Sequence, residues 1–99
     1  MRRIKELADQ IKEELEGAKV YAEKSLDLKA HGDTSRAAKY KDMANDELKH
    51  ALNIHDEAVD EIRKLSEIYT PPASMQEAWD LTHKEYIEKT AWIKTMLQM

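Results

Sequence analysis

A carboxylate and an imidazole lie three residues apart in the middle of the chain, at Glu47 and His50. No glycine or proline occurs between residues 33 and 70, so this segment is expected to be helical. Positions i and i+3 of a helix share a face, and the two side chains can therefore bind one metal ion together. Helical bundles with carboxylate-bound metal pairs use this Glu-x-x-His unit with further Glu residues from facing helices. Because a helix rich in Glu, Lys and His also contains the unit by chance, its meaning depends on what faces it.

Glu14 is the candidate third ligand, in the segment that precedes the turn. Tyr21 follows seven residues later, almost two helical turns, and Ala18 stands between them on the same face. A small residue at this position leaves room for something to bind. Glu13 and Glu16 are alternatives to Glu14, and the spacing to Tyr21 favours Glu14.

The depth of Glu14 matches that of the Glu-x-x-His unit. If the chain folds back at about residue 32 or 33, Glu14 lies beside about residue 51. Glu47 and His50 are within about one turn of that level, so the three side chains can converge. One chain then offers half of the four carboxylates and two histidines that hold a metal pair in such bundles.

A second carboxylate-x-x-His unit, Asp80 to His83, is not expected to complete this site. The turn before it is centred near residue 72, which places the unit beside residues 61–64. His83 is instead expected to be a hydrogen-bonded residue of the inner face, near Glu61. His55 is expected to be a packing or interface residue.

Three helices must position these side chains. Charged residues make up 36% of the 99 residues, and there are only two Gly, two Pro and no Phe. Helix formers dominate, so the chain is predicted to be an all-α single domain over residues 1–99. The helices are expected at about residues 3–30, 35–69 and 75–98, and the first two form a long antiparallel hairpin because the turn between them is short.

The predicted helix ends follow from local chemistry. Gly32 can adopt the left-handed conformation that ends a helix, and Asp33 or Thr34 can cap the next one. The two prolines after Thr70 end the second helix, because proline lacks the N–H donor. Ser74 and Glu77 have the spacing of a capping box at the start of the third helix.

Apolar residues recur every three or four positions in each segment, as expected of one buried helical face. They are Ile4, Leu7, Ile11, Leu15, Ala18, Ala22 and Leu26 in the first helix, Tyr40, Met43, Ala44, Ala51, Ile54, Ala58, Ile62, Leu65, Ile68 and Tyr69 in the second, and Trp79, His83, Tyr86, Thr90, Ile93 and Leu97 in the third. Further apolar residues of the third helix, such as Ile87 and Trp92, lie beyond that face and indicate a partner. We expect a homo-oligomer, most simply a two-fold dimer or a multiple of it. A two-fold axis beside Glu14, Glu47 and His50 would double three ligands to six.

Composition excludes several other classes of function. The net charge of −4 argues against nucleic acid as the main partner. No run of apolar residues is long enough to span a membrane, and none has the length of a signal peptide. Cysteine is absent, which excludes disulfides, thiolate metal sites and cysteine nucleophiles, and a cytoplasmic location is expected.

The metal-binding pattern resembles the first half of ferritins and rubrerythrins. The likeness rests on E-x3-A-x2-Y from Glu14 and A-x2-E-x2-H-A from Ala44, and it covers about residues 7–62. Among small ferritin-like proteins, the chain is similar to encapsulated ferritins, which build their iron site between two subunits. It is most similar to small rubrerythrin-like proteins of bacterial and prophage origin that have no assigned function.

This resemblance implies that Glu14, Glu47 and His50 are iron ligands and that Tyr21 lies beside the site. It also implies that two chains dimerise into a ferritin-like four-helix core. The chain departs from ferritins because it lacks a second Glu and a second Glu-x-x-His unit in matching positions, and no cage can be inferred. It lacks a rubredoxin-type cysteine pair, so rubrerythrin electron transfer is not implied.

Two functions follow as hypotheses. The first is a ferritin-like di-metal carboxylate protein, with iron or manganese in a ferroxidase-like or peroxide-handling site shared between two subunits. Tyr21 could then hydrogen-bond a ligand of the metal pair. The second is a metal-free structural or oligomerisation protein of ferritin-like fold, with a phage or prophage origin as one option.

Overall fold

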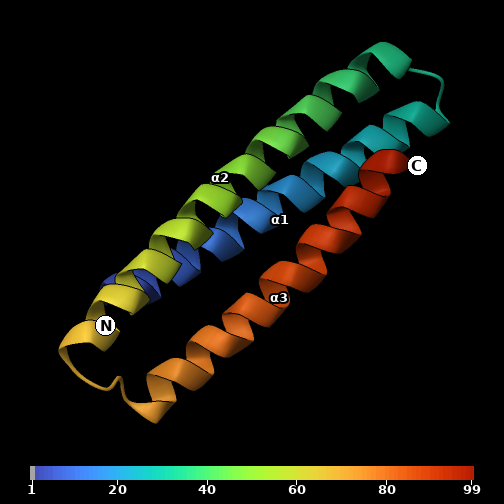
Figure 1. Cartoon of the computed structure of the whole chain (residues 1–99). Helices are drawn as coiled ribbons and strands as arrows, with labels where there is room; N and C mark the ends of the chain where they lie inside the picture. The colour runs from blue at the N-terminus through green and yellow to red at the C-terminus, as the bar shows by residue number, and fades with distance from the viewer. Residues whose placement is uncertain (1) are drawn as a thin grey trace.

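The computed structural model describes residues 2–99 and consists of three α-helices in a rod of 56 × 17 × 17 Å (Figure 1). Helix α1 spans Arg2–Ala30, α2 spans Thr34–Ile68 and α3 spans Ala73–Gln98, and no strand occurs within the described residues. The predicted all-α class and helix order are confirmed, and the predicted bounds are correct to within two residues.

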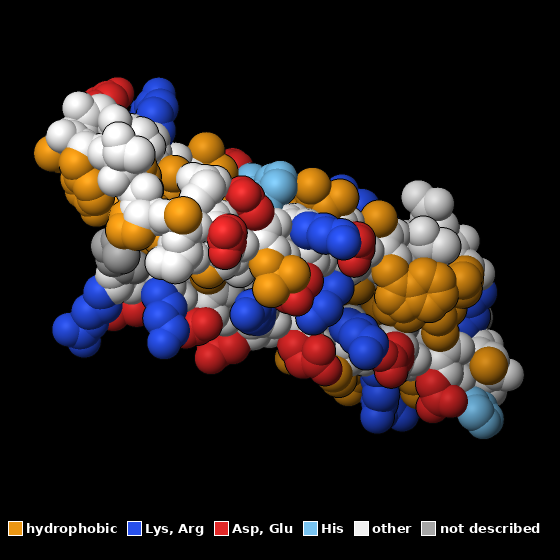
Figure 2. Space-filling view, turned by 90° about the horizontal axis from the view of Figure 1, so that it is seen from below, with side chains coloured by type: hydrophobic (Ala, Val, Ile, Leu, Met, Phe, Trp, Pro, Cys, Tyr) orange, Lys and Arg blue, Asp and Glu red, His pale blue; other side chains and the backbone are white. Residues whose placement is uncertain are grey.

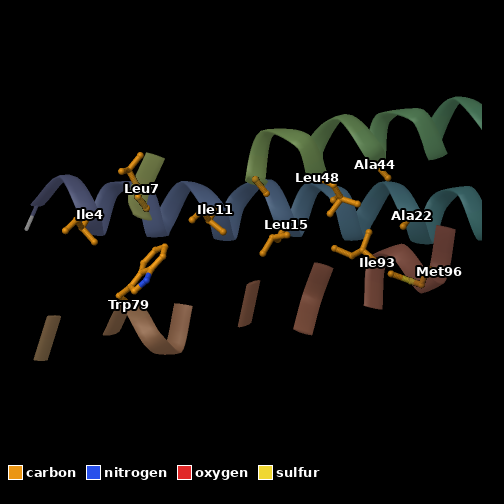
Figure 3. Close-up of a cluster of buried hydrophobic side chains, with 13 residues drawn as sticks. Ile4, Leu7, Ile11, Leu15, Ala22, Ala44, Leu48, Trp79, Ile93 and Met96 are labelled. Atoms are coloured by element: carbon orange, nitrogen blue, oxygen red, sulfur yellow. The ribbon is translucent and has the colours of Figure 1, made fainter. Parts of the chain in front are cut away.

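Alanines line the seam between α1 and α2. Because their side chains are short, the two backbones can approach closely along the whole hairpin. The completely buried alanines are Ala18 and Ala22 of α1 and Ala44, Ala51 and Ala58 of α2. Larger side chains of α1, among them Leu7, Ile11 and Leu15, are at most 2% exposed and fill the space between the three helices (Figure 3).

The turn between α1 and α2 forms as the sequence predicts. Gly32 has a positive φ of 82°, a conformation that a side chain would strain. The Asp33 side chain accepts a hydrogen bond of 3.1 Å from the backbone N–H of Arg36 and caps α2. Backbone groups at the end of α1 and at the start of α2 therefore find hydrogen-bond partners within the turn.

The predicted capping box of α3 is wrong. The N-cap is Pro72, and no side chain caps the helix. The carbonyl of Pro72 accepts hydrogen bonds from the N–H groups of Met75 and Gln76, so the helix begins at Ala73. Because the fixed φ of proline suits a helix start, Ser74 lies inside the first turn rather than at the cap position that the box requires.

Helix α3 packs mainly against α1, although α2 is the helix that precedes it (Figure 1). Figure 3 shows Trp79, Ile93 and Met96 reaching from α3 toward the α1 side chains. These three residues are at most 8% exposed. Met96 is buried although the predicted inner face omits it.

The predicted register of α3 on α2 is wrong by more than a turn. His83 was expected near Glu61, but it forms a 2.9 Å hydrogen bond with His55. The prediction assumed that α3 folds back antiparallel against α2 directly after a turn centred near residue 72. The chain instead leaves α2 through an extended residue, Tyr69, and α3 then follows α1. The expected roles of His83 on the inner face and His55 in packing are confirmed.

Large hydrophobic side chains remain exposed on every helix. Leu81, Ile87 and Trp92 of α3 are each more than half exposed, and hydrophobic patches interrupt the mixed charges of the face in Figure 2. Ile68 was predicted to be buried but is 79% exposed. Arg3 is already paired with Glu57, so the last turns of α2 extend past the start of α1 and Ile68 has no α1 residue to cover it. No helix of the described residues is apolar over a stretch that could cross a membrane.

Candidate metal centre

Glu14 of α1 and Glu47 and His50 of α2 lie together at one edge of the hairpin seam. One carboxylate or imidazole ligand atom from each lies within 4.8 Å of the other two. His50 Nδ1 is 3.5 Å from Glu14 Oε2 and 3.9 Å from Glu47 Oε1. Within residues 2–99, no other three His, Asp or Glu side chains are grouped in this way.

The packing of the hairpin fixes the positions of these side chains. Each ligand directly precedes a buried residue of the seam, namely Leu15, Leu48 or Ala51. Burial of the seam sets the rotation of both helices, so the ligands are held at its edge. The register is held along the hairpin, because Ser25 donates a 2.7 Å hydrogen bond to the Ala37 carbonyl near the turn.

Gly17 provides the space that Glu47 occupies. A Cβ atom added at Gly17 would lie 3.2 Å from Glu47 Oε2, closer than ordinary van der Waals contact. The sequence predicts that Ala18 leaves the open space beside the site, but Ala18 is completely buried in the core. A glycine in a helix interior lowers the stability of the helix by about 1 kcal/mol relative to alanine. A glycine in the middle of the predicted first helix therefore indicates a need for space, and this signal could have identified Gly17.

The Glu14 carboxylate lies beside that of Glu47 and is the main influence on its pKa. A side-chain hydrogen bond with Glu14 raises the pKa of Glu47, and burial and the negative charge of Glu14 raise it further. The charge of His50 has the opposite, smaller effect. A cation between the two carboxylates would offset the repulsion between their negative charges, so this pair favours a positively charged occupant.

The trio is partly open to solvent. The side chain of His50 is 56% exposed, and those of Glu14 and Glu47 are 29% and 26% exposed. Three ligand atoms leave the coordination sphere of an iron or manganese ion incomplete, and in four-helix bundles a facing pair of helices supplies the rest. The three side chains alone are therefore an incomplete set of ligands that is open to solvent at His50.

Tyr21 lies on the same side of α1 but has another neighbour. Its ring is 6.0 Å from that of Tyr40, and no hydrogen bond joins its hydroxyl to the trio within residues 2–99. Tyr21 and Gly17 help to line a shallow surface hollow with a volume of about 370 Å³. Tyr21 therefore shares a hollow with Gly17, the neighbour of Glu47, but it does not hydrogen-bond to any of the three candidate ligands.

The remaining candidates do not join the trio. Glu13 and Glu16 are exposed, which leaves Glu14 as the inward carboxylate of the three. Asp80 accepts a 2.9 Å hydrogen bond from the Gln76 side chain, and His83 contacts His55. The expectation that the second carboxylate-x-x-His unit lies apart from the first one therefore agrees with the structure.

No model of a known protein family, no curated protein and no solved structure matches this chain. The function of the chain is therefore inferred from its own geometry.

Proposed function

We propose that this chain is a ferritin-like di-metal carboxylate protein with a ferroxidase-like or peroxide-handling site shared between two subunits. The observation that carries the proposal is the convergence of Glu14, Glu47 and His50 within 4.8 Å. The donor set fits the metal, because carboxylate oxygens with one imidazole suit iron or manganese. Two iron ions held in this way would supply the electron pairs needed to reduce dioxygen or peroxide.

The protein residues have separate roles in this proposal. Glu14 and Glu47 hold the cation and neutralise its charge, and His50 supplies the nitrogen ligand. Gly17 keeps the space that the Glu47 carboxylate needs. In this proposal Tyr21, which lines the hollow together with Gly17, hydrogen-bonds a small ligand that enters there.

A two-fold dimer would complete the ligand set. Three ligands per chain become six, which matches the four carboxylates and two histidines of a metal-pair site. Exposed apolar side chains occur near the trio on both helices. Val20 of α1 is 53% exposed and lines the hollow with Gly17, and Met43 of α2 is 40% exposed and precedes Glu47 by one helical turn. A partner hairpin packed here would cover both side chains and bring its own trio to the axis.

Metal stoichiometry tests the proposal. Protein purified with added Fe(II) should hold about one iron per chain, and Glu47→Ala with His50→Ala should abolish this binding. Glu13→Gln is the matched control, since Glu13 is an exposed carboxylate adjacent to Glu14. Fewer than about one metal per two chains, or equal binding in the double variant, would refute the proposal.

The exposed apolar surface away from the trio supports a second candidate, a metal-free oligomerisation protein. Ile68 and Trp92 are 79% and 52% exposed, and neither borders the candidate centre. This alternative predicts that a chelator changes neither the melting temperature nor the oligomeric state. The first proposal predicts that chelator lowers both the melting temperature and the dimer fraction of iron-loaded protein.

A further inference from the structure

Two imidazoles meet on the other flank of α2, away from the carboxylate trio. His55 Nε2 lies 2.9 Å from His83 Nδ1, so one helix is joined to another through two ring nitrogens. The Tyr86 ring stacks on His55 with a centroid distance of 4.4 Å and an angle of 9°, and the Trp79 ring is 5.8 Å away. Only 13% of the His55 side chain is exposed. The proposed iron chemistry uses none of these residues.

We propose that His55 and His83 form a second metal site, which binds a borderline divalent ion such as Cu²⁺, Ni²⁺ or Zn²⁺ and links α2 to α3. Imidazole nitrogens bind such ions at about 2.0–2.1 Å. Two ligands at right angles around one ion are then about 2.9 Å apart, and two tetrahedral ligands about 3.4 Å apart. The observed 2.9 Å separation therefore already spans a pair of adjacent coordination positions.

Asp56 supplies the second partner that a metal-binding histidine usually has. Its Oδ1 atom lies 3.4 Å from His55 Nδ1, on the side of the ring opposite to His83. A carboxylate at this nitrogen holds the proton on Nδ1 and leaves the Nε2 lone pair free to bind a metal. His55 thus has a carboxylate at one ring nitrogen and the proposed metal at the other. Metal sites with an orienting carboxylate have this arrangement.

A metal ion can bind between the two histidines without giving either imidazole a charge. With the His55 proton on Nδ1, His83 Nδ1 donates the hydrogen bond to His55 Nε2. A metal ion replaces this one proton, which moves to the Nε2 atom of His83. Both imidazoles stay neutral and each presents one lone pair to the ion.

The surroundings favour a different ion from that of the carboxylate trio. Two nitrogens and no carboxylate oxygen in direct reach select Cu²⁺, Ni²⁺ or Zn²⁺ over iron or manganese. The Tyr86 ring lies nearly parallel to the His55 ring, at a centroid distance of 4.4 Å, and forms one wall of the site. A hollow of about 660 Å³ between α2 and α3 reaches Tyr86, the residue whose ring stacks on His55.

Trp79 provides a direct test, because its ring lies 5.8 Å from His55 and 6.1 Å from His83. In a Trp92→Phe background Trp79 is the sole tryptophan. Added Cu²⁺ should quench its fluorescence to saturation at one ion per chain, and Zn²⁺ should restore the signal by competition. His83→Gln should abolish the saturable quenching, with far-UV circular dichroism confirming that the helices remain.

Two controls separate this site from other histidines. His50→Asn disables the carboxylate centre and His31→Asn removes a histidine exposed near the turn, and both should leave the quenching unchanged. Equal quenching in His83→Gln, or loss of quenching in His50→Asn, would overturn the proposal. If His83→Gln unfolds, Zn²⁺ should still raise the melting temperature of the His50→Asn protein, and no rise there would also overturn it.

Discussion

The two flanks of α2 carry two clusters of opposite character. On one flank Glu47 and His50 face Glu14 of α1, and the donors are mainly carboxylate oxygens. On the other flank His55 faces His83 of α3, and the donors are ring nitrogens among aromatic rings. Five residues separate the two α2 histidines and turn the helix by about 140°, which is enough to present them to different neighbours.

The clusters also differ in what holds them together. The carboxylate trio is positioned by the alanine seam, so its geometry follows from backbone packing that would exist without any metal. The imidazole pair spans α2 and α3, which pack on each other far less than either packs on α1. Its geometry therefore depends on the ring contacts themselves. Substitutions that disturb one flank should reveal how independent the other is.

Leu15→Ala should have the largest effect, because it removes a core side chain that is 2% exposed next to Glu14. Cavity formation should lower the free energy of unfolding by about 2–5 kcal/mol and disturb both flanks, since α1 supports α2 and α3 alike. Urea unfolding followed by circular dichroism measures the loss. A loss below about 1 kcal/mol would show that the core is not shared in this way.

Ala51→Leu should separate the flanks. Ala51 is completely buried in the seam, and the larger side chain would push α1 from α2, at a cost of about 1–3 kcal/mol. Iron binding by the trio should be lost, whereas Cu²⁺ quenching of Trp79 should persist. Ala38→Leu, at an exposed position of α2, is the matched control. Loss of both metal activities at unchanged helicity would contradict the independence of the flanks.

The difference between the flanks also explains which features the sequence could predict. The depth of Glu14 against His50 followed from one short turn of known position and two continuous helices, and the atoms lie 3.5 Å apart. The position of His83 depended on how α3 leaves the Pro-Pro turn and on its choice of α1 as neighbour. Periodicity does not encode that choice, so the expected contact with Glu61 was wrong and the contact with His55 was missed.

The small residues predicted where the two helices pack closely, but not which small residue borders the candidate site. Their spacing identified the seam, and Ala44, Ala51 and Ala58 are buried as the pattern predicts. The pattern could not show that Gly17, rather than Ala18, borders Glu47, because that distinction depends on side-chain direction across two helices.

Gly17→Ala should lower the affinity for iron and raise the stability of the metal-free protein. The new Cβ would lie 3.2 Å from Glu47 Oε2 and displace the carboxylate, which should weaken iron binding. Better helix propensity should raise the free energy of unfolding of the metal-free protein by up to about 1 kcal/mol. Isothermal titration and thermal unfolding of one preparation measure both effects. Unchanged iron affinity would show that Glu47 does not need this space.

Glu47→Gln should have the smallest effect on stability, below about 1 kcal/mol for a partly exposed pair. The pKa of Glu47 is raised in the folded chain, chiefly by its hydrogen bond with Glu14, so the folded state binds the proton more tightly than the unfolded state. This contribution is fully present below the ordinary glutamate pKa and is lost as the pH rises through the raised value. Glutamine cannot ionise, so the variant should lose less stability than the parent protein over that pH range.

Chemical unfolding of the metal-free proteins at a series of pH values measures the difference between them. Glu57→Gln is unsuitable as a control because Glu57 pairs with Arg3, whereas the exposed Glu13→Gln should leave the pH profile unaltered. Saturating Mn²⁺ should reverse the order and make the parent protein the more stable one at neutral pH, because glutamine at position 47 lacks the negative charge that the carboxylate offers to the ion. Parallel pH profiles for parent and Glu47→Gln would mean that Glu14 does not raise the pKa of Glu47 in the folded protein.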